Sequence, residues 1–393
     1  MTPDEGAYAA IAEWAADNAL NDQNNYYRSL YGAGKSLLFP ASILVKFGFD
    51  GLSAIRLIST LYGFLTLVLI VLFVIKLTGR VNDGQFLRRE NQFLLTILLL
   101  IYAFLPSHYS WSVLGLRESA TEFWLVGTFL VFFYVFGLER EIRFLGMLGF
   151  TTCIAFTFSA RPQVGWVLSI SLILYLLTRL RDLKSYFLIP LVLCGTLLGI
   201  VPNTSTTPNT STTPNLGDTL RPIVNIGETI SNKQSVNRVN AASAIEIPAC
   251  PRENSSPLDS LSKNLDRYLC IAWRAPFMVS TFLFRPILGA DVTSTSSLIA
   301  AVENIFWSLL FATIVFLVIR RRAISFLAPI LPALIFFALY VFGASAYQGN
   351  MGTGFRHKSL ILWAALLLIF ALAWRKPTET LENPRNNSQE SAV

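Results

Sequence analysis

Long apolar runs alternate with short charged breaks along most of this chain of 393 residues. A transmembrane helix needs about 20 mostly apolar residues to cross roughly 30 Å of hydrocarbon. The pattern therefore predicts an all-α polytopic membrane protein with about nine transmembrane helices. The predicted spans are residues 53–76, 92–107, 119–138, 144–160, 163–179, 185–202, 299–319, 323–344 and 358–374.

Two amphipathic segments precede the first span. Residues 3–20 place apolar side chains at helical spacing among acidic ones, which predicts a helix lying on the membrane interface. Residues 36–49 are apolar but short, and they contain Pro40 and Lys46, so they predict a re-entrant or interfacial helix. No basic region followed by an apolar one opens the chain, so no signal peptide is predicted.

Composition agrees with this class. Hydrophobic residues make up 53% of the chain, charged residues only 14%, and the mean hydropathy is +0.52, which is too apolar for a soluble protein. A net charge of +7 would indicate nucleic acid in a soluble protein, but here the basic residues gather in alternate connections, as the positive-inside rule requires. We expect a lipid bilayer, and no nucleic acid, as partner.

The basic clusters also predict the orientation. They follow every odd-numbered span, so these spans are expected to end in the cytoplasm. The opening segment and the even-numbered connections then lie outside, in a bacterial inner membrane whose active site faces the periplasm or exterior. An external start without a signal needs a mechanism, and we expect a missing first helix, from a truncated gene model or a chain start placed too late.

Five regions are predicted. They are external amphipathic and interfacial helices at 1–50, a transmembrane bundle at 51–202, an external loop at 203–298, C-terminal transmembrane helices at 299–376 and a cytoplasmic polar tail at 377–393. The loop opens with a repeated NTSTTP hexapeptide, which cannot pack a core, and regains aromatic residues from Leu265, where it is expected to return to the membrane surface. Cys250 and Cys270 lie in this loop, and the sequence leaves open whether they form a disulfide.

The charged residues of the predicted outer side are the candidates for chemistry. Acids, arginines and both histidines of the chain fall on that side, which fits a reaction on an anionic, membrane-tethered substrate. The set is Asp4, Glu5, His108, Arg117, Glu118, Arg161, Arg274, Arg285, Arg356 and His357.

The polar break at 106–122 holds three of these residues and also Glu122. Ser119 and Glu122 match a capping box, which predicts that they start a helix. Arg117 and Glu118 then stand just before the helix N-terminus, where unpaired amides and the helix dipole favour an anion such as phosphate. The alternative is an Arg–Glu pair that snorkels to the interface.

Two further arginines follow the same logic. Arg161 interrupts two spans with only Pro162 to turn on, and an arginine at membrane depth costs about 2.5–3.5 kcal/mol unless it pairs, binds a ligand or snorkels. Arg356 and His357 follow the glycine-rich segment 349–354, whose amides, together with a guanidinium group, can hold phosphate oxygens. The segment lacks the GK[ST] of a P-loop, so ATP binding is not expected.

Asp4 and Glu5 have two interpretations. Acids in a first helical turn offset the helix dipole, which needs no further function. Alternatively, one of them is a general base that removes the proton from an attacking hydroxyl. Spacing alone does not decide between the two.

In their order, these features resemble the GT-C glycosyltransferases, polytopic enzymes that use polyprenyl-phosphate sugars. The resemblance covers nearly the whole chain, although each motif is short. It is closest to uncharacterised, protein-mannosyltransferase-like members associated with exopolysaccharide genes. It rests on PDE at 3–5, the segment 36–56, PSH at 106–108, RES at 117–119, RP at 161–162 and GFRH at 354–357.

The resemblance implies a GT-C-like bundle that transfers a sugar from a polyprenyl-phosphate donor to a glycan or lipid-linked acceptor. Asp4 or Glu5 would be the general base or bind an activating cation, Arg161 and Arg356 would hold the lipid phosphate, and Glu118 would place acceptor or metal. No cofactor is certain, and a divalent cation at Asp4 and Glu118 stays open. This chain departs from the family pattern because no transmembrane helix precedes the acidic motif. The wider phosphate-binding set is His108, Arg117, Arg161, Arg356 and His357.

Two other functions stay open. A polysaccharide polymerase acting on lipid-pyrophosphate oligosaccharides would use the same external arginines and would elongate by whole repeat units. A flippase, transporter or accessory protein of polysaccharide export predicts charges deep within the spans, and the predicted span interiors are almost free of them. The sequence does not identify the sugar, the acceptor or any dependence on metal.

Overall fold

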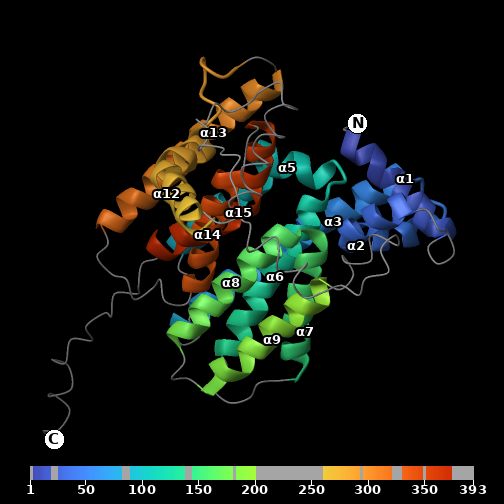
Figure 1. The fold of residues 1–393 in the computed structure, drawn as a ribbon, viewed down its shortest axis with the longest axis horizontal. Helices are drawn as coiled ribbons and strands as arrows, with labels where there is room; N and C mark the ends of the chain where they lie inside the picture. The colour runs from blue at the N-terminus through green and yellow to red at the C-terminus, as the bar shows by residue number, and fades with distance from the viewer. Residues whose placement is uncertain are drawn as a thin grey trace, which may run out of the picture.

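The computed structural model describes residues 3–18, 25–81, 89–137, 144–179, 183–200, 260–292, 295–320, 330–347 and 351–373. Within these ranges the regular structure is helical and contains no strand, which confirms the predicted all-α class (Figure 1). The helices are α1 (Pro3–Asn18), α2 (Asn25–Lys46), α3 (Gly51–Val81), α4 (Arg89–Phe104), α5 (Pro106–Val113), α6 (Arg117–Gly137), α7 (Phe144–Ala160), α8 (Pro162–Thr178), α9 (Leu183–Ile200), α12 (Ser260–Phe284), α13 (Thr295–Arg320), α14 (Leu331–Tyr347) and α15 (Met351–Ala373).

Each predicted span corresponds to a helix in the described part of the chain, namely α3, α4, α6 to α9, and α13 to α15. Three of these helices contain stretches long and apolar enough to cross a membrane: Gly51–Leu77, Ser297–Arg320 and Arg356–Ala373. The protein is therefore a membrane protein. The number of nine spans and their orientation stay predictions.

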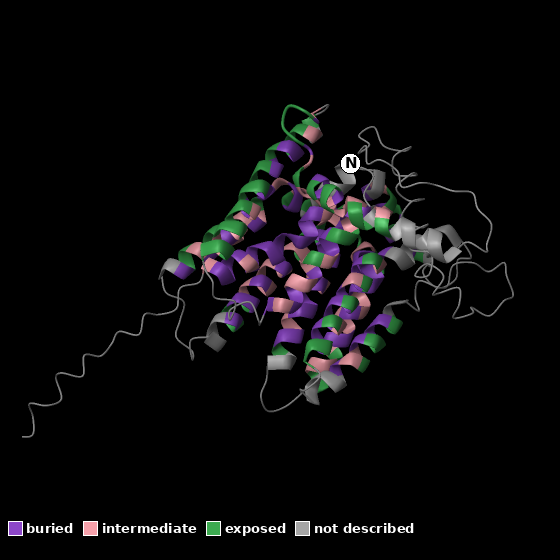
Figure 2. Ribbon diagram, turned by 60° about the vertical axis from the view of Figure 1, so that its left-hand side comes forward, coloured by how far each residue is buried: buried purple, intermediate pink, exposed green. Residues whose placement is uncertain are grey.

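The helices pack around a shared apolar core. In Figure 1, α6 to α9 gather in one bundle, α12 to α15 pack beside it, and α1 and α2 cover the N-terminal part of α3. Buried residues line the inner faces of the helices and exposed residues lie on the outer faces (Figure 2). Helices α13 and α15 differ in how far the protein buries them. Most of α15 is buried, whereas α13 exposes much of its apolar surface. Helix α15 is thus a central element, and α13 presents a face suited to lipid.

The N-terminal helix forms as predicted and docks on the bundle. It buries Ile11 and Ala12 against α2 and α3. The carboxylate of Glu13 accepts a hydrogen bond from the backbone N–H of Gly51 at 2.9 Å, which ties α1 to the start of α3. Helix α2 is longer than the predicted segment 36–49, and it runs through Pro40 without ending there.

The polar break contains a short helix. Pro106–Val113 forms α5, with Ser107 and His108 buried in the protein. The external position of this connection stays a prediction. Helix α6 begins at Arg117, so Ser119 lies inside the first turn and the predicted capping box is wrong. The physical reason is packing, because the Ser119 hydroxyl hydrogen-bonds the Ser59 hydroxyl of α3 at 2.8 Å instead of capping α6.

Two further predictions can be compared with the structure. The tight turn at Arg161 is confirmed: this residue is extended, with φ −150°, and Pro162 is the first residue of α8, where its missing N–H costs nothing. The predicted glycine-rich turn is wrong for residues 351–354, which already belong to α15. Residues 349 and 350 lie outside the described part.

The cysteines also bear on the predictions. Cys270, in α12, is disulfide-bonded, whereas Cys153 and Cys194 are free. Cys250, the repeated hexapeptides and the tail at 377–393 lie outside the described residues.

Candidate functional site

The cluster is built around Glu118, which lies in the first turn of α6 and is 2% exposed. Its carboxylate accepts hydrogen bonds from Arg161, at the turn between α7 and α8, and from Arg356, in the second turn of α15. Arg356 binds it with two nitrogens, and the Nη2–Oε2 distance is 2.9 Å. Two-pronged pairing of this kind is the strong form of the Arg–carboxylate contact. Three of the predicted site residues, remote in sequence, are thus brought together.

His357 contacts Arg161 at a different nitrogen from the one that binds Glu118. Nη1 of Arg161 donates to Nε2 of His357 at 2.8 Å. Because a guanidinium group has only donors, Nε2 must carry the lone pair, which makes the imidazole neutral with its proton on Nδ1. That Nδ1–H faces the hydroxyl oxygen of Tyr340, from α14, at 3.3 Å. Tyr340 was not a sequence candidate, since it lies within an apolar run without a polar break.

Arg117 brings a third guanidinium group to the cluster. Electrostatic interactions couple it to Glu118, Arg161 and Arg356. The Nε atoms of Arg117 and Arg161 are buried without a hydrogen-bond partner. Three positive charges against one carboxylate give this cluster a net charge of +2. A bound anion would accept hydrogen bonds from these buried Nε atoms and would balance the excess positive charge.

The ionisation of Glu118 follows from its neighbours. Burial raises the pKa of this carboxyl group, but the guanidinium groups of Arg161 and Arg356 outweigh burial and hold the pKa at about 2. Glu118 is therefore ionised at neutral pH. It is a weak base there, because two arginines already hold its oxygens.

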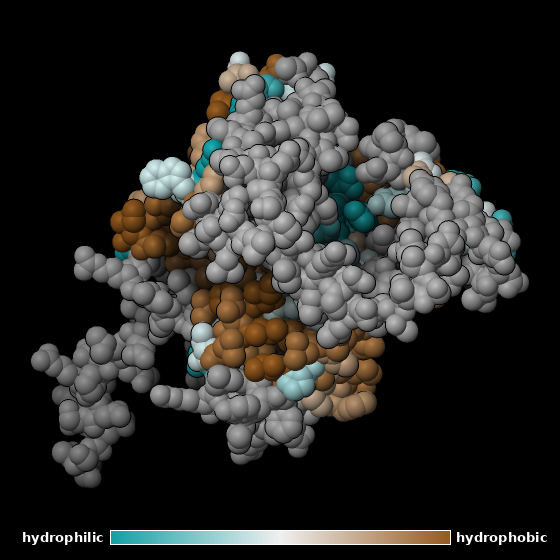
Figure 3. Space-filling model, viewed as in Figure 1, coloured by the Kyte–Doolittle hydropathy of each residue, from teal (hydrophilic) through white to brown (hydrophobic). Residues whose placement is uncertain are grey.

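Helix α1 reaches the cluster through Tyr8. This side chain interacts electrostatically with all three arginines and with Glu118, and burial raises its pKa, so the phenol is neutral. Figure 3 shows hydrophilic side chains in a recess where, in the same view, Figure 1 places α5 and α1. Tyr8 was not a candidate site residue, because it belongs to the apolar face of the amphipathic helix predicted at residues 3–20.

Glu5 lies one turn before Tyr8 and is fully buried. Its carboxylate accepts a hydrogen bond from Nε of Arg56, in α3, at 2.6 Å. The side chain of Asp4 lies outside the described residues. Among the described residues no group of three or more His, Cys, Asp or Glu could hold a metal ion, so the predicted cation at Asp4 and Glu118 stays a prediction.

His108 takes part in a different pair. Its Nε2 lies 3.0 Å from Oε2 of Glu122, and its ring packs on Tyr102 with the ring centroids 4.0 Å apart. Glu122 follows Glu118 by one turn of α6, so the pair lies next to the arginine cluster. Glu122 is thus a partner of His108, a role that the predicted capping box had not given it.

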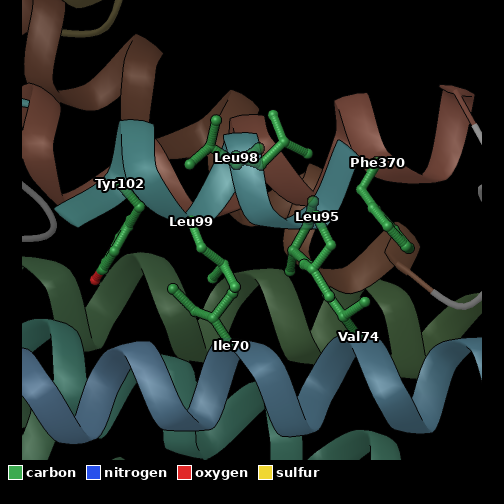
Figure 4. A pocket seen from close by; sticks show the side chains of 9 residues that line it. Ile70, Val74, Leu95, Leu98, Leu99, Tyr102 and Phe370 are labelled. Atoms are coloured by element: carbon green, nitrogen blue, oxygen red, sulfur yellow. The ribbon is translucent and has the colours of Figure 1, made fainter. Parts of the chain in front are cut away.

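An apolar pocket lies between α3, α4 and α15. It is small and partly open, with a cavity volume of about 10 Å³, and Tyr102 lines it (Figure 4). The same tyrosine packs on His108, so the pocket borders the His108–Glu122 pair. The lining residues are Ile70, Val74, Leu95, Leu98, Leu99, Tyr102, Leu366, Leu367 and Phe370.

The described part of the chain thus defines an all-α membrane protein with a buried cluster of arginines around one glutamate. Comparison with protein-family models, with curated proteins and with solved structures found no match.

Proposed function

We propose that this protein is a membrane glycosyltransferase that moves a sugar from a polyprenyl-phosphate donor to a glycan or lipid-linked acceptor at the extracytoplasmic face. The observation that carries the proposal is the cluster of Arg117, Arg161 and Arg356 around Glu118, with its net charge of +2. Excess positive charge inside a protein is costly unless a ligand balances it. A lipid phosphate supplies that charge and several strong acceptor oxygens.

The charge fits the chemistry of the transfer. The acceptor oxygen bonds to the anomeric carbon, the bond from that carbon to the phosphate oxygen breaks with its electron pair, and the hydroxyl proton passes to a base. The donor phosphodiester carries one negative charge, and the leaving lipid phosphate gains a second. A site with net charge +2 therefore stabilises the developing dianion more than the bound donor, which is the condition for catalysis.

The structure also favours a division of roles. Glu118, with a pKa of about 2, is too weak a base to take the hydroxyl proton, and we assign it to orienting Arg161 and Arg356. Of the two acids of α1, Asp4 is the better candidate for the base, because α1 places Tyr8 beside the cluster whereas Glu5 is fully buried and already binds Arg56.

One other feature supports the proposal. The disulfide at Cys270 fits an oxidising compartment, as expected for the predicted external loop at 203–298, which contains α12.

A polymerase acting on lipid-pyrophosphate oligosaccharides is the second candidate. A lipid pyrophosphate joined to a sugar carries two negative charges, which would balance the net charge of +2 in the bound donor itself. The products distinguish the two candidates, because a polymerase adds whole repeat units and a transferase adds single sugars.

The test is transfer by purified full-length protein in lipid nanodiscs. A panel of polyprenyl-phosphate sugars with a labelled sugar would be incubated with glycan and lipid-linked acceptors, with and without chelator. We expect the label to move to an acceptor with at least one donor. Absence of transfer across the panel, in protein that binds phosphate, would overturn the transferase assignment.

The same charge argument predicts selectivity among simple anions. At pH 8 and matched ionic strength, inorganic phosphate, mostly a dianion, should raise the melting temperature of the purified protein more than dimethyl phosphate, a monoanion. A ligand at 100 times its Kd adds about 2.7 kcal/mol of stability. Equal shifts for the two anions would contradict the proposed charge match.

A further inference from the structure

Three consecutive residues of α15, Arg356 to Lys358, form hydrogen bonds with different parts of the protein. Arg356 binds Glu118 and His357 binds Arg161, whereas Lys358 faces away from the cluster. Lys358 is fully buried, and its ammonium group donates to Oδ1 of Asn304 at 2.5 Å. It also donates to the carbonyl oxygens of Leu283 and Arg285, at 3.0 and 2.9 Å. All three donors of the ammonium group are thus used.

The partners of Lys358 belong to the connection between α12 and α13. Asn304 of α13 donates its side-chain amide to the carbonyl oxygen of Pro286 at 2.9 Å. The guanidinium group of Arg285 binds Asp291 through Nε and Nη2, at 3.0 and 2.5 Å. Lys358 therefore joins the start of α15 to a connection that is itself held by several hydrogen bonds.

Glu303, next to Asn304, makes the corresponding link to α5. Its carboxylate accepts from the backbone N–H of Ser107 at 2.6 Å and from the Ser107 hydroxyl at 2.5 Å. Nε1 of Trp307 donates to the same carboxylate at 3.2 Å. Since His108 follows Ser107 and pairs with Glu122 of α6, buried polar contacts connect α6, α15, α13, α5 and α6 again.

We propose that Lys358 and Glu303 are positioning residues of the arginine cluster. This inference rests on the function proposed above, in which the cluster binds a phosphate group. Successive residues of a helix are about 100° apart around its axis, so anchoring Lys358 against α13 fixes the directions of Arg356 and His357. Glu303 fixes the start of α5 in the same way. In the described part of the chain, neither side chain forms a hydrogen bond or ion pair with Glu118, Arg117 or Arg161, and each acts through the helix that it holds.

The protein does not need the buried charges of Lys358 and Glu303 for stability alone. Replacing a buried ion pair by apolar side chains of similar volume is often neutral or stabilising. An all-apolar contact between α13 and α15 would hold the helices together but would not select one rotation of α15. The directional hydrogen bonds of Lys358 do select one.

The test uses the two histidines of the chain, which give separate signals in protein labelled with ¹⁵N-histidine. In the wild type, His357 should show a neutral ring with the proton on Nδ1. In Lys358→Met, we expect the His357 signals to leave this pattern, because the contact with Arg161 is displaced. The affinity for inorganic phosphate should fall by about tenfold, within the range for changes along a coupled network.

Thr196→Val is the matched control, because it removes a buried hydroxyl pair with Ser169, at 2.8 Å, between α8 and α9. It should lower the melting temperature without changing His357 or phosphate affinity. If Lys358→Met does not yield folded protein, Asn304→Ala removes one acceptor of Lys358 and should shift the same signals less. Unchanged His357 signals and phosphate affinity in the folded variant would overturn the positioning role, whether or not the wild type transfers sugar.

Discussion

Alanine at Arg356 is expected to abolish sugar transfer while the protein still inserts into the membrane. This side chain supplies two of the hydrogen bonds that hold Glu118 and one of the three positive charges of the cluster. Loss of a single donor to a developing negative charge typically costs about 10²–10³ in rate, and the loss of a whole guanidinium group should exceed it. Arg161→Ala should have the same effect, because Arg161 binds both Glu118 and His357.

Transfer rates of variants in nanodiscs would measure this effect. Arg356→Lys keeps the charge but loses the two-pronged geometry, so it should retain only part of the activity. Arg320→Ala is the control, because Arg320 is an exposed arginine at the far end of α13 and should leave transfer unchanged. Full activity in both Arg356→Ala and Arg161→Ala would contradict the proposed function.

Glu118→Ala is expected to destabilise the protein by about 3–5 kcal/mol, because it leaves the buried guanidinium group of Arg161 and the mostly buried one of Arg356 without their carboxylate. The net charge of the cluster then rises to +3, from three arginines with no counter-charge. Inorganic phosphate should therefore restore more stability to this variant than to the wild type. Thermal unfolding with and without phosphate measures both effects.

Glu122→Ala is the matched control for Glu118→Ala. Glu122 is a buried acid one turn further along α6, but it pairs with His108 rather than with an arginine. Its removal should destabilise the protein without producing an enhanced response to phosphate. An equal response of the two variants would mean that Glu118 is not the counter-charge that limits anion binding by the arginine cluster.

The helices were predictable because each apolar run is long enough to exclude the alternatives. The site was predictable in part: Glu118, Arg161, Arg356 and His357 stood at charged breaks on one predicted side, and the structure brings them together. Their pairing was not predictable, since contacts between residues up to 238 positions apart leave no local periodicity.

Three errors have the same physical cause. Ser119 looked like a helix cap because a capping box is a local pattern, yet its hydroxyl is taken by Ser59 of another helix. Lys358 and Glu303 fall inside predicted spans that otherwise lack charge. Mean hydropathy over a span does not reveal a single charged residue whose partner lies on another helix. Tertiary packing decided each of these positions.

The most direct measurement is an experimental structure of the full-length protein in nanodiscs with a short polyprenyl phosphate, and with the corresponding polyprenol as control. We predict phosphate density within hydrogen-bonding distance of Arg161 and Arg356, close to the Nε atoms of Arg117 and Arg161, which are buried without a partner in the ligand-free structure. The alcohol should leave this position without such density. Phosphate bound elsewhere, with the arginine cluster unchanged around Glu118, would contradict the assignment of this site.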